Sequence, residues 1–139
     1  MKTELKQVVV VGAGPSGSTV SALLKSRGID VVVLEKATFP RFSIGESLLP
    51  ACMEVVEQAG MTHAVKQFGF QYKDGAAFRR NGVDTQFDFT NKYTPGPGTT
   101  FQVQRANFDK VLADSAEEQG VEIRYQHELL NLVFEGKKS

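Results

Sequence analysis

Three glycines with fixed spacing are the residues of this sequence best placed to bind a phosphate. They lie in a six-residue run that directly follows four valines, Gly12-Ala13-Gly14-Pro15-Ser16-Gly17. Gly12 permits a tight turn out of a strand, Gly14 lets the backbone approach a pyrophosphate without a Cβ, and Gly17 lets helix and strand pack closely. A helix that starts here directs its N-terminal N–H groups and the positive end of its dipole toward the phosphates. The run therefore predicts a dinucleotide-binding loop.

The residues around this loop supply the context that the motif needs. Gln7–Val11 predicts a strand before it, a helix follows it, and Val31–Glu35 predicts a second strand. Glu35 lies at the end of that strand, about 20 residues beyond the loop, where a carboxylate accepts the hydroxyl protons of an adenosine ribose. Its charge disfavours a 2′-phosphate. One alternative stays open, a glycine-rich turn in an α/β domain that binds no nucleotide.

Composition limits the class of protein. The chain has 139 residues, 41% of them hydrophobic, with 16 basic and 16 acidic residues, so we expect one globular domain without a footprint for nucleic acid. No apolar run is long enough for stable insertion into a membrane. The single cysteine, Cys52, excludes an internal disulfide and favours a cytoplasmic location. His63 and His127 have no partner at ligand spacing, so no metal site is predicted.

The order of the elements predicts an α/β fold of the Rossmann type, in which residues 1–35 form the βαβ dinucleotide-binding unit. The first strand, with four consecutive valines, is expected to be buried on both faces. The next parallel strand is predicted only at Val121–Tyr125, after a helix over Arg105–Gln119. Residues 36–119 are therefore expected to be an insertion between the second and third strands of the parallel sheet.

The insertion is predicted to combine helices with an antiparallel hairpin. Ser47 is expected to cap a helix over Leu48–Ala59, and a short helix over Thr62–Phe68 follows. Asn81-Gly82, between two alternating segments, is the strongest short-range signal for a hairpin. Phe101–Gln104 predicts another strand before the long helix.

The end of the chain predicts that the fold is incomplete. Leu129–Phe134 is expected to form a further strand, and the chain stops soon after it. A strand without a returning partner leaves a sheet edge unpaired, and two strands of a doubly wound sheet are missing. We therefore expect these 139 residues to be the N-terminal part of a longer protein.

A second, more specific stretch follows the second strand and reads Phe39-Pro40-Arg41-Phe42-Ser43-Ile44-Gly45-Glu46-Ser47-Leu48-Leu49-Pro50. A third stretch reads Val103-Gln104-Arg105-Ala106-Asn107-Phe108-Asp109. Together with the glycine loop and Glu35-Lys36, these stretches resemble the flavin-dependent halogenases and the related geranylgeranyl-reductase-like FAD oxidoreductases. Both groups belong to the larger p-hydroxybenzoate-hydroxylase-type flavoprotein fold. The resemblance covers essentially the whole chain, and it implies that residues 1–139 are the N-terminal part of an FAD-binding oxidoreductase domain.

The resemblance also implies which residues bind the cofactor. The pyrophosphate of FAD would be held by the glycine loop, which is Gly12, Ala13, Gly14, Pro15, Ser16 and Gly17. Glu35 would hold the adenosine ribose, with Lys36 beside it, and Arg41 would lie near the ribose or phosphates. The residues implied near the isoalloxazine ring are Gly45, Glu46 and Ser47. Arg105 would also reach toward the cofactor, and residues 71–104 would begin the sheet that covers the substrate.

Lys73 is the predicted catalytic residue. By resemblance, it falls where flavin-dependent halogenases place the lysine that captures hypohalous acid and delivers the halogen to the substrate. The chemistry suits a lysine, because an amine that is partly desolvated loses basicity and becomes nucleophilic. Two alternatives stay open. In the first, Lys73 is simply a solvated lysine before a strand, as most lysines are. In the second, the chain belongs to a related protein that keeps a lysine at this position but does not halogenate.

Three functions are compatible with the sequence. The first is an FAD-dependent oxidoreductase of monooxygenase or reductase type, which acts on a small-molecule substrate. Its flavin would be reduced by NADH, by NADPH or by a partner flavin reductase. The second function is a flavin-dependent halogenase that uses Lys73. The third is a domain that binds a nucleotide without catalysing a reaction.

Overall fold

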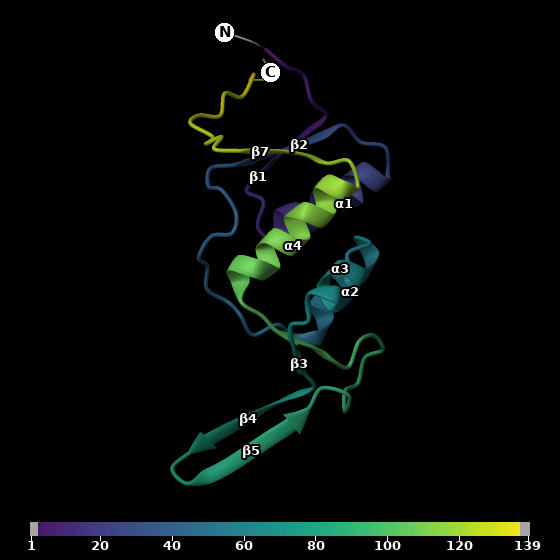
Figure 1. Ribbon diagram of the computed structural model, residues 1–139, viewed down its shortest axis with the longest axis vertical. Coiled ribbons are helices and arrows are strands. Elements are labelled where there is room, and N and C mark those ends of the chain that lie inside the picture. The colour runs from purple at the N-terminus through teal and green to yellow at the C-terminus, as the bar shows by residue number, and fades with distance from the viewer. Residues whose placement is uncertain (1–2, 137–139) are drawn as a thin grey trace.

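The computed structural model describes residues 3–136, and Figure 1 shows how they are arranged. The centre of the fold is a parallel sheet with strand order β1-β2-β7, formed by β1 (Val8–Val11), β2 (Val31–Glu35) and β7 (Glu122–Tyr125). Val33 of β2 lies opposite Val10 of β1 and opposite Ile123 of β7. The predicted βαβ unit and the predicted third parallel strand are confirmed by this pairing.

Two helices cover one face of the sheet. α1 (Pro15–Ser26) connects β1 to β2, and α4 (Arg105–Glu118) leads into β7. Both lie on the same side of the sheet (Figure 1), where Leu112 and Ala116 of α4 pack with Val33 in the main core. None of the helices within residues 3–136 combines the length and the apolar character needed to cross a membrane.

The part of the insertion that precedes α4 extends from the end of α1 and α4 that is remote from the sheet (Figure 1). Its helices are α2 (Pro50–Gln58) and α3 (Thr62–Phe68), and its strands are β3 (Gln71–Lys73), β4 (Gly75–Arg80), β5 (Val83–Asp88) and β6 (Thr100–Gln102). β3 pairs antiparallel with β6, and β4 pairs antiparallel with β5. These two helices and the turn between them join the main core through five buried side chains, Met53, Val56, Ala59, Met61 and Val65.

The β4–β5 hairpin projects away from the rest of the molecule (Figure 1). It turns at Asn81-Gly82, whose φ angles are +51° and +79°, as a two-residue hairpin turn requires. All residues of β5 are exposed, and Phe78 of β4 stacks on Phe87 with ring centroids 6.0 Å apart. The hairpin predicted from the sequence is confirmed, but its strands are not packed against the main core.

The prediction that β1 is buried on both faces is wrong. Val9 and Val11 expose 51% and 60% of their surface. Their strand lies at the edge of the sheet, and α1 and α4 cover only one face of that sheet. In β2, which has a neighbour on each side, Val31–Val33 are all buried. Val32, which lies opposite Val9 in the register, is among these buried residues, so the central position of β2 and the edge position of β1 account for the difference.

Two further predictions about the elements are wrong. Ser47 does not cap a helix, because α2 begins at Pro50 with Leu49 in the N-cap position, and Ser47 instead forms a bridge with Gln102. Pro50 is suited to a first helical position, where its missing N–H is not needed. Leu129–Phe134 is not a strand. Within the described part of the chain no segment pairs with it, and an extended segment becomes a strand only when its backbone groups have a partner.

Candidate functional site

The glycine loop connects β1 to α1, and two of its glycines are required by the backbone. Gly12 has a φ of +94°, and its N–H donates to the carbonyl of Leu34 at 2.7 Å. A Cβ added to Gly17 would lie 1.8 Å from the Gly12 carbonyl oxygen. The loop therefore closes so tightly against the start of α1 that only glycine fits at position 17.

The N-terminus of α1 is open for an anion. Gly14 is the N-cap residue and Pro15 follows it, and among the residues that the structure describes no side chain caps this end of the helix. The first hydrogen bond of the turn runs from the N–H of Ser18 to the carbonyl of Gly14 at 2.9 Å. The earlier N–H groups of a helix have no partner inside it, and the helix dipole adds positive potential there. This end can therefore bind a phosphate group.

Glu35 ties the glycine loop to the end of β2. Its side chain is buried, its Oε2 accepts the N–H of Ala13 at 2.8 Å, and its Oε1 accepts the N–H of Ala37 at 2.9 Å. A carboxylate has about four lone-pair positions, so Glu35 keeps the capacity to accept further hydrogen bonds. Glu35 therefore fixes the shape of the loop as well as presenting an acid beside it.

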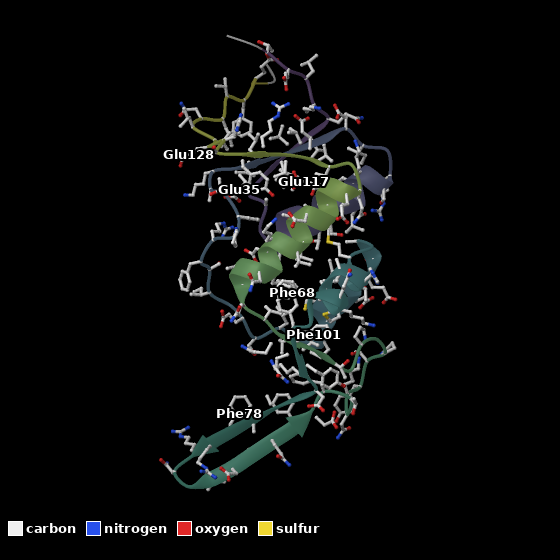
Figure 2. The ribbon with its side chains drawn as sticks, viewed as in Figure 1. Glu35, Phe68, Phe78, Phe101, Glu117 and Glu128 are labelled. Carbon is white, nitrogen blue, oxygen red and sulfur yellow. The ribbon has the colours of Figure 1, made fainter. Side chains whose placement is uncertain are left out.

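A cavity of about 530 Å³ lies at the carboxyl ends of the parallel strands. Six of the residues that line it are Gly12, Glu35, Lys36, Arg41, His127 and Glu128. The N–H of His127 donates to the carbonyl of Glu35 at 3.0 Å, which holds the segment after β7 against the end of β2. Figure 2 shows Glu35 and Glu128 in this region. Ligands of open α/β sheets bind in a crevice at this position.

Arg41, Arg105 and Asp109 form an ionic cluster next to the glycine loop. Asp109 is completely buried, and Arg105 donates to both of its carboxylate oxygens, at 2.7 and 3.1 Å. Arg41 lies 3.7 Å from Asp109 and 3.8 Å from Glu35. If Gly14 had a Cβ, that atom would lie 3.7 Å from the Nη2 of Arg41 and 4.0 Å from Asp109. The cluster therefore places positive charge close to the N-terminus of α1.

Residues 45–47 are held against the segment that precedes α4. Gly45 has a φ of +92°, and Arg105 donates to the neighbouring carbonyl of Ile44. The carbonyl of Glu46 accepts the N–H of Val103 at 2.8 Å, while its side chain is exposed. The structure thus brings Gly45 and Arg105 together, as members of a common site would require.

Lys73 lies at the end of β3, in the part of the fold between α2 and the β4–β5 hairpin (Figure 1). Its Nζ donates to the Oγ of Ser47 at 2.7 Å and to the carbonyl of Leu48 at 2.9 Å. The Nζ also lies 5.2 Å from the centroid of the Phe89 ring. Lys73 is therefore a fixed, half-buried amine rather than a freely solvated lysine.

Tyr125 is the last residue of β7 and lies opposite Glu35 of β2 in the parallel sheet. Burial, together with the carboxylates of Glu117 and Asp114, raises the pKa of Tyr125 to about 12. Its ring meets the ring of Phe39 edge-on, with centroids 5.6 Å apart. At neutral pH the phenol is protonated, so Tyr125 supplies packing and a hydrogen-bond donor rather than a charge.

Comparison with known proteins identifies the family. The FAD binding domain family matches residues 6–138. This chain belongs to that family. A flavin-dependent halogenase of Armillaria mellea is 36% identical over 133 residues, which are 92% of this chain and 25% of the relative. The chain spans about a quarter of the length of the curated relatives that it matches.

Two solved structures resemble this FAD-binding domain along almost its whole length. A flavoprotein/dehydrogenase from Cytophaga hutchinsonii superimposes with a TM-score of 0.92 and 46% identity, over 96% of this chain and 33% of that protein. The myxobacterial chondrochloren halogenase gives a TM-score of 0.88 and 39% identity, over 96% of this chain and 31% of that halogenase. The resemblance to flavin-dependent halogenases and the Rossmann-like fold, both predicted from the sequence, are confirmed.

The residues of this FAD-binding domain fit its cofactor, FAD. The open N-terminus of α1 and the nearby guanidinium of Arg41 suit a pyrophosphate. The cavity beside Glu35 lies where the adenosine half of a dinucleotide is bound in this type of fold. The roles predicted for the individual residues, including Lys36, Gly45, Glu46 and Ser47, stay predictions.

Three residues of the site were not predicted from the sequence. Asp109 lies four residues after Arg105, and this spacing on a helix signals an ion pair. His127 and Glu128 directly follow the third parallel strand, a position that in open α/β sheets faces the ligand crevice. Within residues 3–136, no group of three or more His, Cys, Asp and Glu side chains gathers as a metal site would require.

Proposed function

We propose that this chain is the FAD-binding part of an FAD-dependent oxidoreductase that acts on a small molecule. The observation that carries the proposal is the contact of buried Glu35 with the N–H of Ala13, because it sets the glycine loop in a fixed shape beside the open N-terminus of α1. Membership of the FAD binding domain family supports it. The protein would be a monooxygenase or a reductase, with NADH, NADPH or a partner flavin reductase as the source of electrons.

Each part of the site has a role in this proposal. The N–H groups at the start of α1 and the Arg41 guanidinium bind the pyrophosphate, and Glu35 accepts the hydroxyl protons of the ribose. Gly45, Glu46 and Ser47 line the flavin side, where the absence of a Cβ at position 45 lets the backbone approach a flat ring. When bound, FAD supplies the redox chemistry, while the protein supplies binding, orientation and electrostatics.

The absorption spectrum of the full-length protein tests the proposal. We expect a yellow protein with a flavin band, and calorimetry that detects FAD binding to the protein stripped of its cofactor. Gly14→Val should weaken this binding by at least about tenfold, because its side chain would occupy the space next to Arg41. Val83→Ala, on the remote hairpin, is the matched control and should bind like the wild type.

A protein that stays colourless after reconstitution and gives no heat with FAD would contradict the proposal. Binding of ADP without binding of FAD would instead favour the third function, a nucleotide-binding domain without catalysis.

A second candidate function is flavin-dependent halogenation. The specific observation that favours it is the position of the Lys73 amine, held by Ser47 and Leu48 at hydrogen-bond distance. Ser47 is the last residue of the segment that we assign to the flavin side, so its contact with Lys73 would link this lysine directly to the cofactor site. In this proposal Lys73 captures hypohalous acid and passes the halogen to the substrate. The names of the relatives, several of which are halogenases, support this candidate.

Lys73→Met in the full-length protein distinguishes the two candidates. A halogenase should lose halogenation of its substrate by at least about 100-fold, while reduced flavin is still oxidised by oxygen at the wild-type rate. Lys66→Met, in the last turn of α3, is a control that should change neither rate. Halogenation that survives in Lys73→Met would exclude the proposed role of this lysine.

A further inference from the structure

Arg41 and Arg105 lie beside the same buried carboxylate, but they share it unequally. Arg105 donates from Nε to Oδ1 of Asp109 at 2.7 Å and from Nη2 to Oδ2 at 3.1 Å. It also donates from Nη1 to the carbonyl of Ile44. Arg41 Nη1 lies 3.7 Å from Oδ2 of Asp109, which is beyond hydrogen-bond distance. Arg105 therefore neutralises most of the charge on Asp109.

Arg41 keeps its hydrogen-bond donors uncommitted. Its Nε lies 3.8 Å from Glu35, and its guanidinium carbon lies 4.9 Å from the centre of the Phe39 ring. Among residues 3–136, no acceptor lies within hydrogen-bond distance of the Arg41 guanidinium, and 30% of its side chain is exposed. The ion pairs with Glu35 and Asp109 set its place near Gly14, the N-cap residue of α1. Its five N–H donors are available to a ligand at that helix end.

We propose that Asp109 is a positioning residue for the pyrophosphate site. Because Arg105 neutralises its charge, Asp109 orients Arg41 without forming a hydrogen-bonded ion pair with it. This inference rests on the proposed FAD site. Arg41 then binds the pyrophosphate, whereas Arg105 acts only through Asp109 and the backbone of Ile44. The two arginines that the family resemblance implies near the cofactor have different roles in this arrangement.

The charge balance of the cluster explains why Arg105 matters. Glu35 and Asp109 are acids, and Arg41 and Arg105 are the cations that face them. If Arg105 is removed, the buried Asp109 is left with Arg41 as its nearest cation, and an unpaired buried charge is strongly unfavourable. Arg41 then moves to Asp109 and its donors are lost to the pyrophosphate. Removal of Asp109 as well sets Arg41 free again.

Binding of ADP and of adenosine to the full-length protein, stripped of its cofactor, tests this inference. Only ADP carries the pyrophosphate, so the ratio of the two dissociation constants isolates that group from general damage to the fold. We expect Arg41→Met to weaken ADP binding by about 10- to 100-fold and to leave adenosine binding within about twofold, as for the loss of hydrogen bonds to a charged group. Lys110→Met, which breaks the half-exposed ion pair with Asp114 on the same helix, is the matched control and should leave both unchanged.

The variants at Arg105 decide between a direct and an indirect role. We expect Arg105→Met to weaken ADP binding by about tenfold, and Arg105→Met/Asp109→Leu to bind ADP within about threefold of the wild type. Arg105→Lys keeps a cation beside Asp109 and should also stay within about threefold. This variant replaces Arg105→Met as the test if the latter does not fold.

Two results would overturn the inference. In the first, the double variant Arg105→Met/Asp109→Leu binds ADP as weakly as Arg105→Met, or the ADP affinity of Arg105→Lys drops as far as that of Arg41→Met. Either outcome would mean that Arg105 binds the pyrophosphate itself. If Arg105→Met folds and binds ADP like the wild type, Asp109 does not draw Arg41 away. A wild-type protein that binds neither ADP nor FAD overturns the proposed function, whereas one that binds both leaves these variants to decide the inference alone.

Discussion

The parallel sheet with α1 and α4, here called the sheet region, and the β4–β5 hairpin differ in what determines their structure. In the sheet region the strands pair and their inner face is also covered, so Val33 and Leu112 are completely buried. In the hairpin the strands pair over six residues each, but Phe78, Val83 and Phe87 stay exposed. Local turn chemistry is therefore enough to pair two strands, whereas a buried core needs elements that are distant in the sequence.

Gly17→Ala should have the largest effect in the sheet region. The new Cβ would lie 1.8 Å from the Gly12 carbonyl oxygen, which is backbone and cannot move aside without opening the loop. We expect the free energy of unfolding to fall by roughly 4 kcal/mol or more, measured by urea denaturation. Gly14→Ala is the matched control, because its Cβ would meet only ordinary contacts at 3.7 and 4.0 Å. Equal stability of the two variants would show that the loop is not closed as described.

Leu112→Ala and Val83→Ala compare the two regions directly. Leu112 is completely buried, so its truncation should cost about 3 kcal/mol of unfolding free energy, through lost burial and a cavity. Val83 exposes 66% of its surface, and its truncation should cost no more than about 0.5 kcal/mol. A large loss for Val83→Ala in this 139-residue chain would mean that the hairpin is packed against something.

Gly82→Ala should weaken the hairpin alone. Gly82 has a φ of +79°, and a side chain in this conformation costs about 1–2 kcal/mol. We expect faster hydrogen exchange of the amides that pair β4 with β5, and no change in β1, β2 and β7. Asn81→Gly is the control, since it relieves the φ of +51° at that position and should not speed exchange. Faster exchange in the sheet as well would show that the two regions unfold together.

Tyr125→Phe should change the response of the sheet region to alkaline pH. The folded protein raises the pKa of Tyr125 to about 12, while an unfolded tyrosine has a pKa of about 10. The folded state thus keeps a proton that the unfolded state loses, so this stabilisation is complete below about pH 10 and lost as the pH rises to about 12. We expect a smaller loss of stability over this interval in Tyr125→Phe than in the wild type. Tyr93→Phe, at a fully exposed side chain, is the control and should follow the wild type.

The sequence predicts the elements whose signals are local. The valine run of β2, the glycines of the loop and Asn81-Gly82 each act within a few residues, and the structure has a strand, a tight loop and a hairpin at these places. The limits of α3, Thr62–Phe68, are also those predicted, since Gly69 ends the helix in the left-handed conformation.

The remaining features depend on partners that are distant in the sequence. Val9 and Val11 belong to the same run as the partly buried Val10, and their exposure depends on the sheet order and on the placement of α1 and α4. The hydroxyl of Ser47 is bound to Lys73, 26 residues further along the chain, rather than to a helix end. The sharing of Asp109 by Arg41 and Arg105 likewise requires the loop after β2 to lie against α4.

The double contact of Glu35 has a consequence for how a ligand is received. One carboxylate accepts hydrogen bonds from the amides of both Ala13 and Ala37. The ligand-binding loop therefore takes its final conformation when the chain folds, before any ligand binds. Little backbone freedom is then left to lose on association, so more of the contact energy appears as affinity. The same rigidity favours ligands whose phosphates already match the spacing of the amides.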